Sequence, residues 1–183
     1  MRVISGKYKS RPLKPVQGMK TRPTADKVKE ALFHRIGPYF EGGAVLDLYA
    51  GTGNLGIEAL SRGAEHAVFV DKNPQAVKVI KQNLKSVGIQ EDTQVYCNEA
   101  GRALNALDKR NKKFTFIFLD PPYAVNVLPS LLESISDKGL VTQTGTIVCE
   151  HHASIRLPEQ IGELNRLTME NYGDTNVSLY IKE

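Results

Sequence analysis

The chain has 183 residues, of which 41% are hydrophobic and 24% are charged, enough for one globular domain with a full core. No apolar run approaches the roughly 18 residues of a membrane span, and the basic N-terminus has no apolar stretch behind it, so a membrane protein and a secretory signal are excluded and we expect a cytoplasmic protein. The net charge of +4 is uneven, because residues 1–30 carry +7 and the remainder carries −3. A basic arm on a mildly acidic body indicates a polyanionic partner, although a solvated tail would have the same composition.

Residues 1–36 are predicted to form an N-terminal extension, and residues 37–183 the main domain. Within the extension, residues 2–11 mix a short apolar start with cations, which predicts a short strand or hairpin with Lys and Arg on one face. Residues 25–36 are predicted to be a helix with Thr24 as its N-cap and Val28, Leu32 and Ile36 on its apolar face. Gly37-Pro38 ends this helix.

A glycine-rich loop follows a predicted strand at residues 44–49 and precedes a predicted helix at residues 54–61. Its spacing, Gly51-x-Gly53-x-x-Gly56, fits a dinucleotide-binding loop, which is weak evidence by itself. Glycines allow a tight turn and bring N–H groups close to a ligand at the helix N-terminus. The loop therefore predicts a cofactor site.

Strands and helices then alternate. Strands are predicted at residues 67–70, 93–97, 114–119 and 146–150, and helices at 74–87, 100–107 and 128–136. Two further β-rich runs, residues 164–172 and 175–182, are joined by Gly173-Asp174 as a hairpin. This order predicts an α/β fold, a doubly wound Rossmann-like sheet with one antiparallel strand.

Acidic residues follow two of these strands. Asp71 ends the strand at 67–70, where such folds bind a nucleoside ribose. Asp120-Pro121-Pro122-Tyr123 ends the strand at 114–119, and its prolines restrict the backbone, so that an acid, a carbonyl and an aromatic ring are positioned at the sheet's ligand-binding edge. We expect the chemistry of the protein at this tetrapeptide. Cys97 and Cys149 are predicted to be buried free thiols, and no metal site is expected.

Asp47 with the glycine loop, Asp71 and the Asp-Pro-Pro-Tyr tetrapeptide, in this order, resemble a class I S-adenosylmethionine-dependent methyltransferase, whose sheet has seven strands. The tetrapeptide further resembles methylases of exocyclic amino groups of bases. Three blocks select one family within that set: RVISGKYKSR at 2–11, RPTADKVKEALF at 22–33 and LSRGA at 60–64. The chain thus resembles the bacterial 16S ribosomal RNA guanine-N2 methyltransferase family of the RsmD type, over almost its whole length.

The resemblance implies S-adenosylmethionine as cofactor, and ribosomal RNA or a partly assembled small subunit as the substrate of a monomer. It implies a methyl-transfer site at Asp120, Pro121, Pro122 and Tyr123. It implies that the cofactor is bound by Asp47, Ala50, Gly51, Gly53 and Asn54, by Asp71 at the ribose, by Asn98 or Glu99 at the adenine, and by Arg22 and Thr24 closing over it. Arg2, Lys7, Lys9 and Arg11 would bind RNA phosphates.

Three alternatives remain open at this stage. A DNA or RNA adenine-N6 methylase would share the tetrapeptide, although the chain is short for the target-recognition insert that the DNA enzymes usually carry. A nicotinamide-dependent oxidoreductase would share the glycine spacing, but it would leave the tetrapeptide unexplained. A non-catalytic RNA-binding protein on a methylase scaffold would not need acids at Asp47, Asp71 and Asp120 together.

Overall fold

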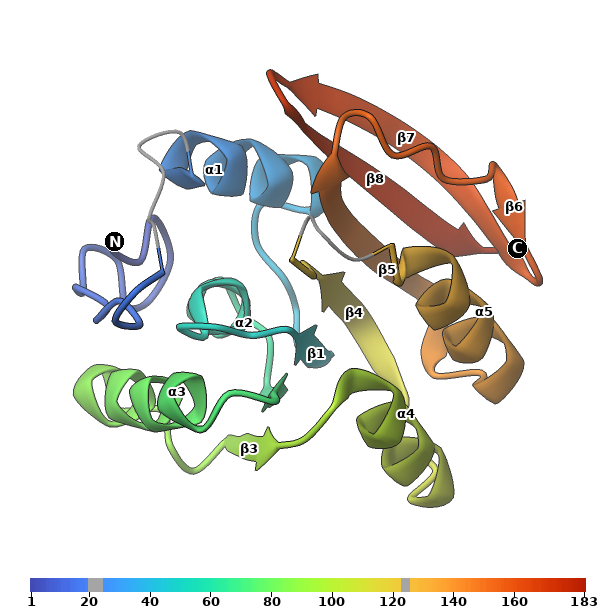
Figure 1. Ribbon diagram of the computed structural model, residues 1–183. Helices are drawn as coiled ribbons and strands as arrows, with labels where there is room; N and C mark the ends of the chain where they lie inside the picture. Colours follow the sequence, from blue (N-terminus) through green and yellow to red (C-terminus); the bar gives the residue numbers. More distant parts are fainter. Residues whose placement is uncertain (20–24, 123–125) are drawn as a thin grey trace.

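The computed structural model describes residues 1–19, 25–122 and 126–183 (Figure 1). Within these ranges a single sheet contains eight strands in the order β3-β2-β1-β4-β5-β8-β7-β6. The strands are β1 Ala44–Leu48, β2 His66–Asp71, β3 Thr93–Cys97, β4 Phe114–Leu119, β5 Val141–His152, β6 Gln160–Ile161, β7 Leu164–Tyr172 and β8 Thr175–Lys182. The helices are α1 Ala25–Ile36, α2 Asn54–Ser61, α3 Pro74–Val87, α4 Ala100–Lys109 and α5 Leu128–Lys138.

The first five strands are parallel, and β8 inserts antiparallel beside β5. The predicted doubly wound sheet with a closing hairpin is confirmed. The described sheet has one strand more than the predicted seven, because the two-residue β6 pairs with the outer edge of β7. Both cysteines are free, but only Cys149 is buried and Cys97 is exposed, so the prediction of two buried thiols was wrong for Cys97.

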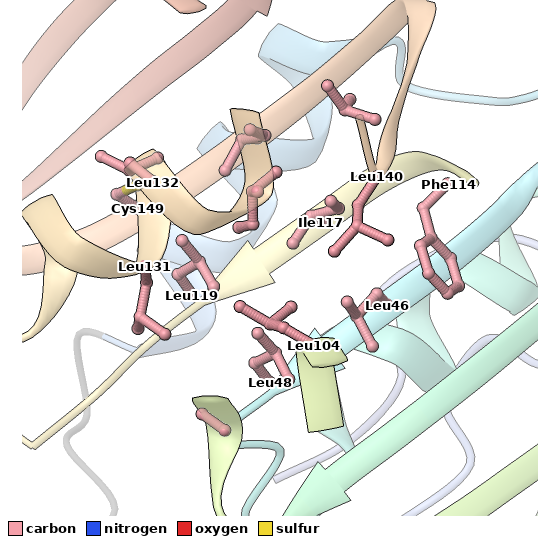
Figure 2. Close-up of a cluster of buried hydrophobic side chains, with 14 of the residues drawn as sticks. Leu46, Leu48, Leu104, Phe114, Ile117, Leu119, Leu131, Leu132, Leu140 and Cys149 are labelled. Atoms are coloured by element: carbon pink, nitrogen blue, oxygen red, sulfur yellow. The ribbon is translucent and has the colours of Figure 1, made fainter. Parts of the chain in front are cut away.

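Helices cover both faces of the sheet. Alternate side chains of a strand point to opposite faces, so Leu46 and Leu48 belong to one core cluster and Val45 to the other. Figure 2 shows the first cluster, in which Leu104 of α4 and Leu132 of α5 pack against the central strands. The second cluster lies under α1, α2 and α3. Burial on both faces explains why the parallel strands are continuous apolar runs.

Strand β5 is longer than predicted. It begins at Val141, whereas the sequence indicated Thr146, because a polar stretch precedes the apolar part of the strand. Its pairing with β4 shifts register between Phe114 and Phe116. The irregular part of the strand contains Gly145, where a Cβ would lie 2.9 Å from the Thr115 carbonyl oxygen.

The N-terminal segment, residues 1–19, packs on the domain. The predicted strand or hairpin is reduced to one isolated bridge between Arg2 and Pro12. Val3, Leu13 and Val16 are buried, so the segment is not a solvated tail. Gly6 has a φ of 91°, and a Cβ there would lie 2.0 Å from the Ser61 carbonyl oxygen. The close approach to α2 therefore requires glycine.

Candidate active site

A cavity of about 580 Å³ opens at the carboxyl ends of β1, β2, β4 and β5. The strand order reverses between β1 and β4, which is where open α/β sheets bind ligands. Its walls also include the N-terminal segment, α1, the loop between β1 and α2, and the hairpin of β7 and β8. The predicted site residues that line it are Asp47, Ala50, Gly51, Asn54, Asp71, Asp120, Pro121 and Pro122.

The glycine-rich loop is supported by the two predicted acids. The Gly51 N–H donates to Asp71 Oδ2 and the Gly56 N–H donates to Asp47 Oδ2, both at 2.9 Å. Gly51 and Gly53 have φ angles of 59° and 82°, which residues with a Cβ rarely adopt. The positive φ angles of the glycines and the hydrogen bonds to the two acids together fix the tight turn of the loop at the cavity wall.

Asp47 and Asp71 differ in environment. Burial raises the pKa of Asp47 to about 8, the hydrogen bond from Gly56 opposes that rise, and the charge of Asp71 adds to it. Asp71 is partly exposed, and its Oδ1 accepts from the Asn73 N–H at 2.9 Å. Asp47 is therefore an internal support of the loop, whereas the Asp71 side chain is more exposed in the cavity.

Three other predicted cofactor residues lie outside the described wall of the cavity. Gly53 is the N-cap of α2. Glu99 is the N-cap of α4, and its Oε1 accepts from the Gly101 N–H at 3.0 Å. The Asn98 N–H donates to the Asp71 carbonyl at 3.1 Å, so the pair Asn98-Glu99 adjoins Asp71. The adenine contact remains a prediction.

The tetrapeptide begins directly after β4. Asp120 is partly buried, Pro121 is buried and Pro122 is exposed, and all three line the cavity. The structure thus brings the predicted methyl-transfer residues to the same cavity as the glycine loop. Tyr123, Arg22 and Thr24 lie outside the described residues.

Lys29 of α1 lines the cavity and had not been predicted as a site residue. It is 2% exposed, and its Nζ donates to Asn54 Oδ1 and to the Arg2 carbonyl, both at 2.7 Å. Its Nζ also lies 3.2 Å from Glu58 Oε2, and Arg62 Nε donates to Glu58 Oε1 at 2.9 Å. Burial lowers the pKa of Lys29, and the charge of Glu58 opposes that shift. These contacts connect the cavity wall to α2 and to the N-terminal segment.

The N-terminal segment runs along α2, a helix about 12 Å long. Glu58 accepts the N–H groups of Ile4 and Ser5 at 2.9 and 3.1 Å, and the Lys7 N–H donates to the Ser61 carbonyl at 2.8 Å. The segment therefore reaches from the cavity, which Met1 and Val16 line, to the far end of α2. The predicted RNA-binding side chains are all exposed: Arg2, Lys7, Lys9 and Arg11.

Two further wall residues were missed from the sequence. Glu150 lies on β5, beside the end of β4, and Tyr172 ends β7. The Tyr172 hydroxyl donates to Glu170 Oε2 at 2.8 Å. An acid at the end of the apolar run of β5 was a usable signal for Glu150, like the acids after β2 and β4. Tyr172 had no comparable signal, because β7 alternates like any half-exposed strand.

Within residues 1–19, 25–122 and 126–183, no group of three or more His, Cys, Asp or Glu could hold a metal ion. None of the helices in those ranges has the length and apolar character needed to span a membrane.

Known proteins are similar to this chain over most or all of its length. The family model described as "Conserved hypothetical protein 95" matches residues 1–181. "Putative rRNA methyltransferase YlbH" of Bacillus subtilis is 52% identical over 182 residues, covering 100% of this chain and 99% of that protein. "Ribosomal RNA small subunit methyltransferase D" of Escherichia coli is 28% identical over 158 residues, covering 86% of this chain and 78% of that protein.

Solved structures agree with these relatives. "Putative methyltransferase yhhF from Escherichia coli" superposes with a TM-score of 0.83 at 27% identity, covering 100% of this chain and 98% of that chain. A methyltransferase complexed with SAH, at 13% identity and a TM-score of 0.68, shares the fold over 88% of this chain and 50% of that chain. The fold predicted from the sequence is thus found in methyltransferase structures.

Proposed function

The chain belongs to the family described as "Conserved hypothetical protein 95", and from that premise we propose that it methylates the exocyclic N2 amino group of a guanine in small-subunit ribosomal RNA, with S-adenosylmethionine as the donor. Relatives named ribosomal RNA small subunit methyltransferase D support the substrate and the reaction class. The observation that carries the proposal is the presence of Asp120-Pro121-Pro122 and of the glycine loop with Asp71 in one cavity. Action as a monomer in the cytoplasm remains part of the same prediction.

The cavity residues suit this cofactor. The volume of about 580 Å³ lies within the range of about 300–1,000 Å³ that is usual for ligand sites. Asp71, at the end of β2, is assigned to the ribose hydroxyls, and Ala50, Gly51 and Asn54 to the methionine part. Asn98 or Glu99 is assigned to the adenine, and Arg22 and Thr24 to closure over the cofactor. When bound, S-adenosylmethionine supplies an electrophilic methyl group on a sulfonium sulfur.

Asp120 and the Pro121 carbonyl activate the amino group by positioning it. The guanine amino nitrogen is a poor nucleophile, because its lone pair is delocalised into the ring. If the two acceptors take its two hydrogens, the lone pair turns toward the methyl donor. Orientation of this kind lowers a barrier by about 7–11 kcal/mol. The Asp120 carboxylate also stabilises the positive charge that develops on nitrogen.

The remaining assignments concern the RNA. A guanine inside a helix must leave its stack to reach a cavity. Tyr123 is assigned to stacking on this base, a contact worth about 1–3 kcal/mol. Arg2, Lys7, Lys9 and Arg11 are assigned to phosphates along α2, at a distance from the reacting base. This placement suits a large structured RNA better than a short oligonucleotide.

Mass mapping of modified guanines tests the proposal most directly. Small subunits and free ribosomal RNA from cells lacking the gene are incubated with the protein and S-adenosylmethionine, and modified nucleotides are mapped before and after. We expect one guanine to gain an N2-methyl group. An unchanged map would refute the proposal, and a methylated adenine would establish the adenine-N6 alternative.

Asp120→Ala separates catalysis from cofactor binding. We expect methyl transfer to fall below detection, because the amino group loses its charged acceptor, while the affinity for S-adenosylmethionine changes by less than about threefold. Single-turnover methyl transfer and calorimetric titration measure the two quantities. Full turnover by this variant would remove Asp120 from the mechanism.

A further inference from the structure

Glu150 of β5 lies beside Asp120, the residue that directly follows β4. Leu119 of β4 pairs with Cys149 of β5, so Asp120 and Glu150 are the next residues along the two chain segments. Adjacent strands lie about 4.8 Å apart. Both residues line the cavity. The site therefore presents two acidic residues about one strand spacing apart.

The two acids also lie on the same face of the sheet. Phe118 and Val148, two residues earlier on each strand, belong to the core cluster under α1, α2 and α3. Residues two apart on a strand share a face, so Asp120 and Glu150 continue that face beyond its apolar part. Val177, the β8 partner of Glu150, belongs to the same cluster. Glu150 is thus placed beside Asp120 on the side where α1 and the N-terminal segment close the cavity.

Guanine and adenine differ on the edge next to the amino group. N1 of guanine carries a hydrogen, whereas N1 of adenine carries a lone pair. An ionised carboxylate is an acceptor only, so it binds the guanine N1–H and repels the adenine N1. It offers about four acceptor positions, so a contact within the protein leaves room for a base. Asp120 could accept both hydrogens through its two oxygens, so a variant at Glu150 has to decide which acid takes the N1–H.

We propose that Glu150 is a specificity-determining residue that accepts the N1–H of the target guanine, while Asp120 and the Pro121 carbonyl accept the amino hydrogens. This proposal rests on the proposed function and extends it. It explains how a site with an Asp-Pro-Pro-Tyr tetrapeptide, which adenine methylases share, selects guanine. The N1–H and the amino group are neighbours on one edge of the base, as Glu150 and Asp120 are neighbours on one edge of the sheet.

2-Aminopurine tests the assignment, because it keeps the amino group of guanine but has a bare N1. The modified nucleotide is first located by mapping, and the RNA is then reconstituted with guanine or 2-aminopurine at that position. Wild-type protein, Glu150→Gln and a control, Glu133→Gln, are compared by kcat/KM. Glu133 is exposed on α5 and is outside the described cavity wall, so the control removes the same charge elsewhere.

We expect wild-type protein and the control to prefer guanine over 2-aminopurine by about 10- to 100-fold, the usual value of a hydrogen bond to a charged group. Glu150→Gln should lose a few-fold to about 10-fold on guanine, because the amide oxygen can still accept the N1–H but carries no charge. The preference of Glu150→Gln for guanine over 2-aminopurine should fall to within a few-fold, because the glutamine amide can donate to the bare N1. Comparison of this ratio between wild-type protein and Glu150→Gln cancels the difference in intrinsic reactivity of the two bases. The affinity of Glu150→Gln for S-adenosylmethionine should match that of wild-type protein, which verifies that the variant folds.

Two results would overturn the assignment. In the first, Glu150→Gln loses activity equally on both bases, so that the ratio of kcat/KM on guanine to kcat/KM on 2-aminopurine is unchanged. This result indicates a structural role. The other is wild-type protein that methylates 2-aminopurine as well as guanine, and this result needs no variant. Absence of methyl transfer from wild-type protein to any RNA would instead refute the proposed function, and this assignment with it.

Discussion

The acids that support the cavity wall, Asp47 and Asp71 on one side and Glu58 on the other, have partners at very different distances along the chain. Asp47 and Asp71 accept backbone N–H groups 9 and 20 residues away. Glu58 accepts backbone N–H groups 54 and 53 residues away, together with two cationic side chains. The first pair shapes the glycine loop, and Glu58 attaches the N-terminal segment to α2.

The difference shows two ways of burying an acid. Burial pushes Asp47 toward its neutral form, the hydrogen bond from the Gly56 N–H opposes this shift, and the charge of Asp71 adds to it. Glu58 is also fully buried, but Lys29 and Arg62 compensate its charge. Removal of Glu58 therefore leaves two buried cations near one another, whereas neutralisation of Asp47 relieves a penalty.

Glu58→Gln should lower the free energy of unfolding by about 3–5 kcal/mol, the usual cost of leaving a buried charge without its partner. Glutamine is neutral, so Lys29 and Arg62 lose their counter-charge. Its amide also replaces only one of the two acceptor oxygens. Urea unfolding measures the change. Glu91→Gln, at an exposed position before β3, is the matched control and should change stability by less than about 0.5 kcal/mol.

A loss below about 1 kcal/mol for Glu58→Gln would place this cluster among weak surface ion pairs. The loop acids and Glu58 would then not differ in how their burial is compensated.

The same contrast explains what the sequence could and could not predict. The glycine loop, Asp71 and Asp120 were predictable because each follows an apolar strand, and parallel strands bring their carboxyl ends to one edge. The Lys29–Glu58 contact joins α1 to α2 and depends on their packing. A signal for it existed in part, since Lys29 lies three residues before the buried Leu32 and four before Phe33 on α1.

The start of β5 and the path of the N-terminal segment were the less predictable parts of the fold. Residues 142–145, Thr-Gln-Thr-Gly, lack the apolar pattern of a strand, and the pairing of Val141 with Phe114 of β4, ahead of the register shift, starts the strand before them. The cations of residues 2–11 suggested a free arm, because the contribution of Val3 to the core depends on α2 being present beside it. Charge indicated a polyanionic partner for this segment, which stays a prediction, and gave no sign of its attachment.

Removal of two cations from the N-terminal segment should weaken RNA binding in a salt-dependent way. Deletion of the whole segment would also remove Val3, Leu13 and Val16 from the core, so charge substitution is the sharper test. Lys7→Ala with Lys9→Ala should reduce the slope of log K against log salt by about 1.4, or about 0.7 for each phosphate contact. Fluorescence titration of ribosomal RNA at 50–200 mM salt, about the range over which such contacts act, measures the slope.

The matched control is Lys109→Ala with Lys112→Ala. Both are exposed at the end of α4 and in the turn before β4, at the edge of the sheet opposite the cavity. This control should keep the wild-type slope. An equal change in both double variants would indicate a general effect of net charge, and would argue that the N-terminal segment does not carry the RNA contact.

Asp47→Asn should change the pH dependence of stability, because the folded pKa of Asp47 is raised to about 8 from the ordinary value of 3.8. A raised folded pKa means that the folded state binds the proton more tightly. The stabilisation is therefore complete below pH 3.8 and is lost as pH rises toward 8.

Asparagine does not titrate and can still accept from the Gly56 N–H, so the variant lacks this loss. Relative to Asp47→Asn, the wild-type protein should lose about 1 kcal/mol between pH 6 and pH 7, close to the limit for one proton. Urea unfolding of both proteins without cofactor measures the difference, in which the titration of the other groups cancels. A constant difference across this range would mean that Asp47 is already ionised at pH 6 and supports the loop through its charge.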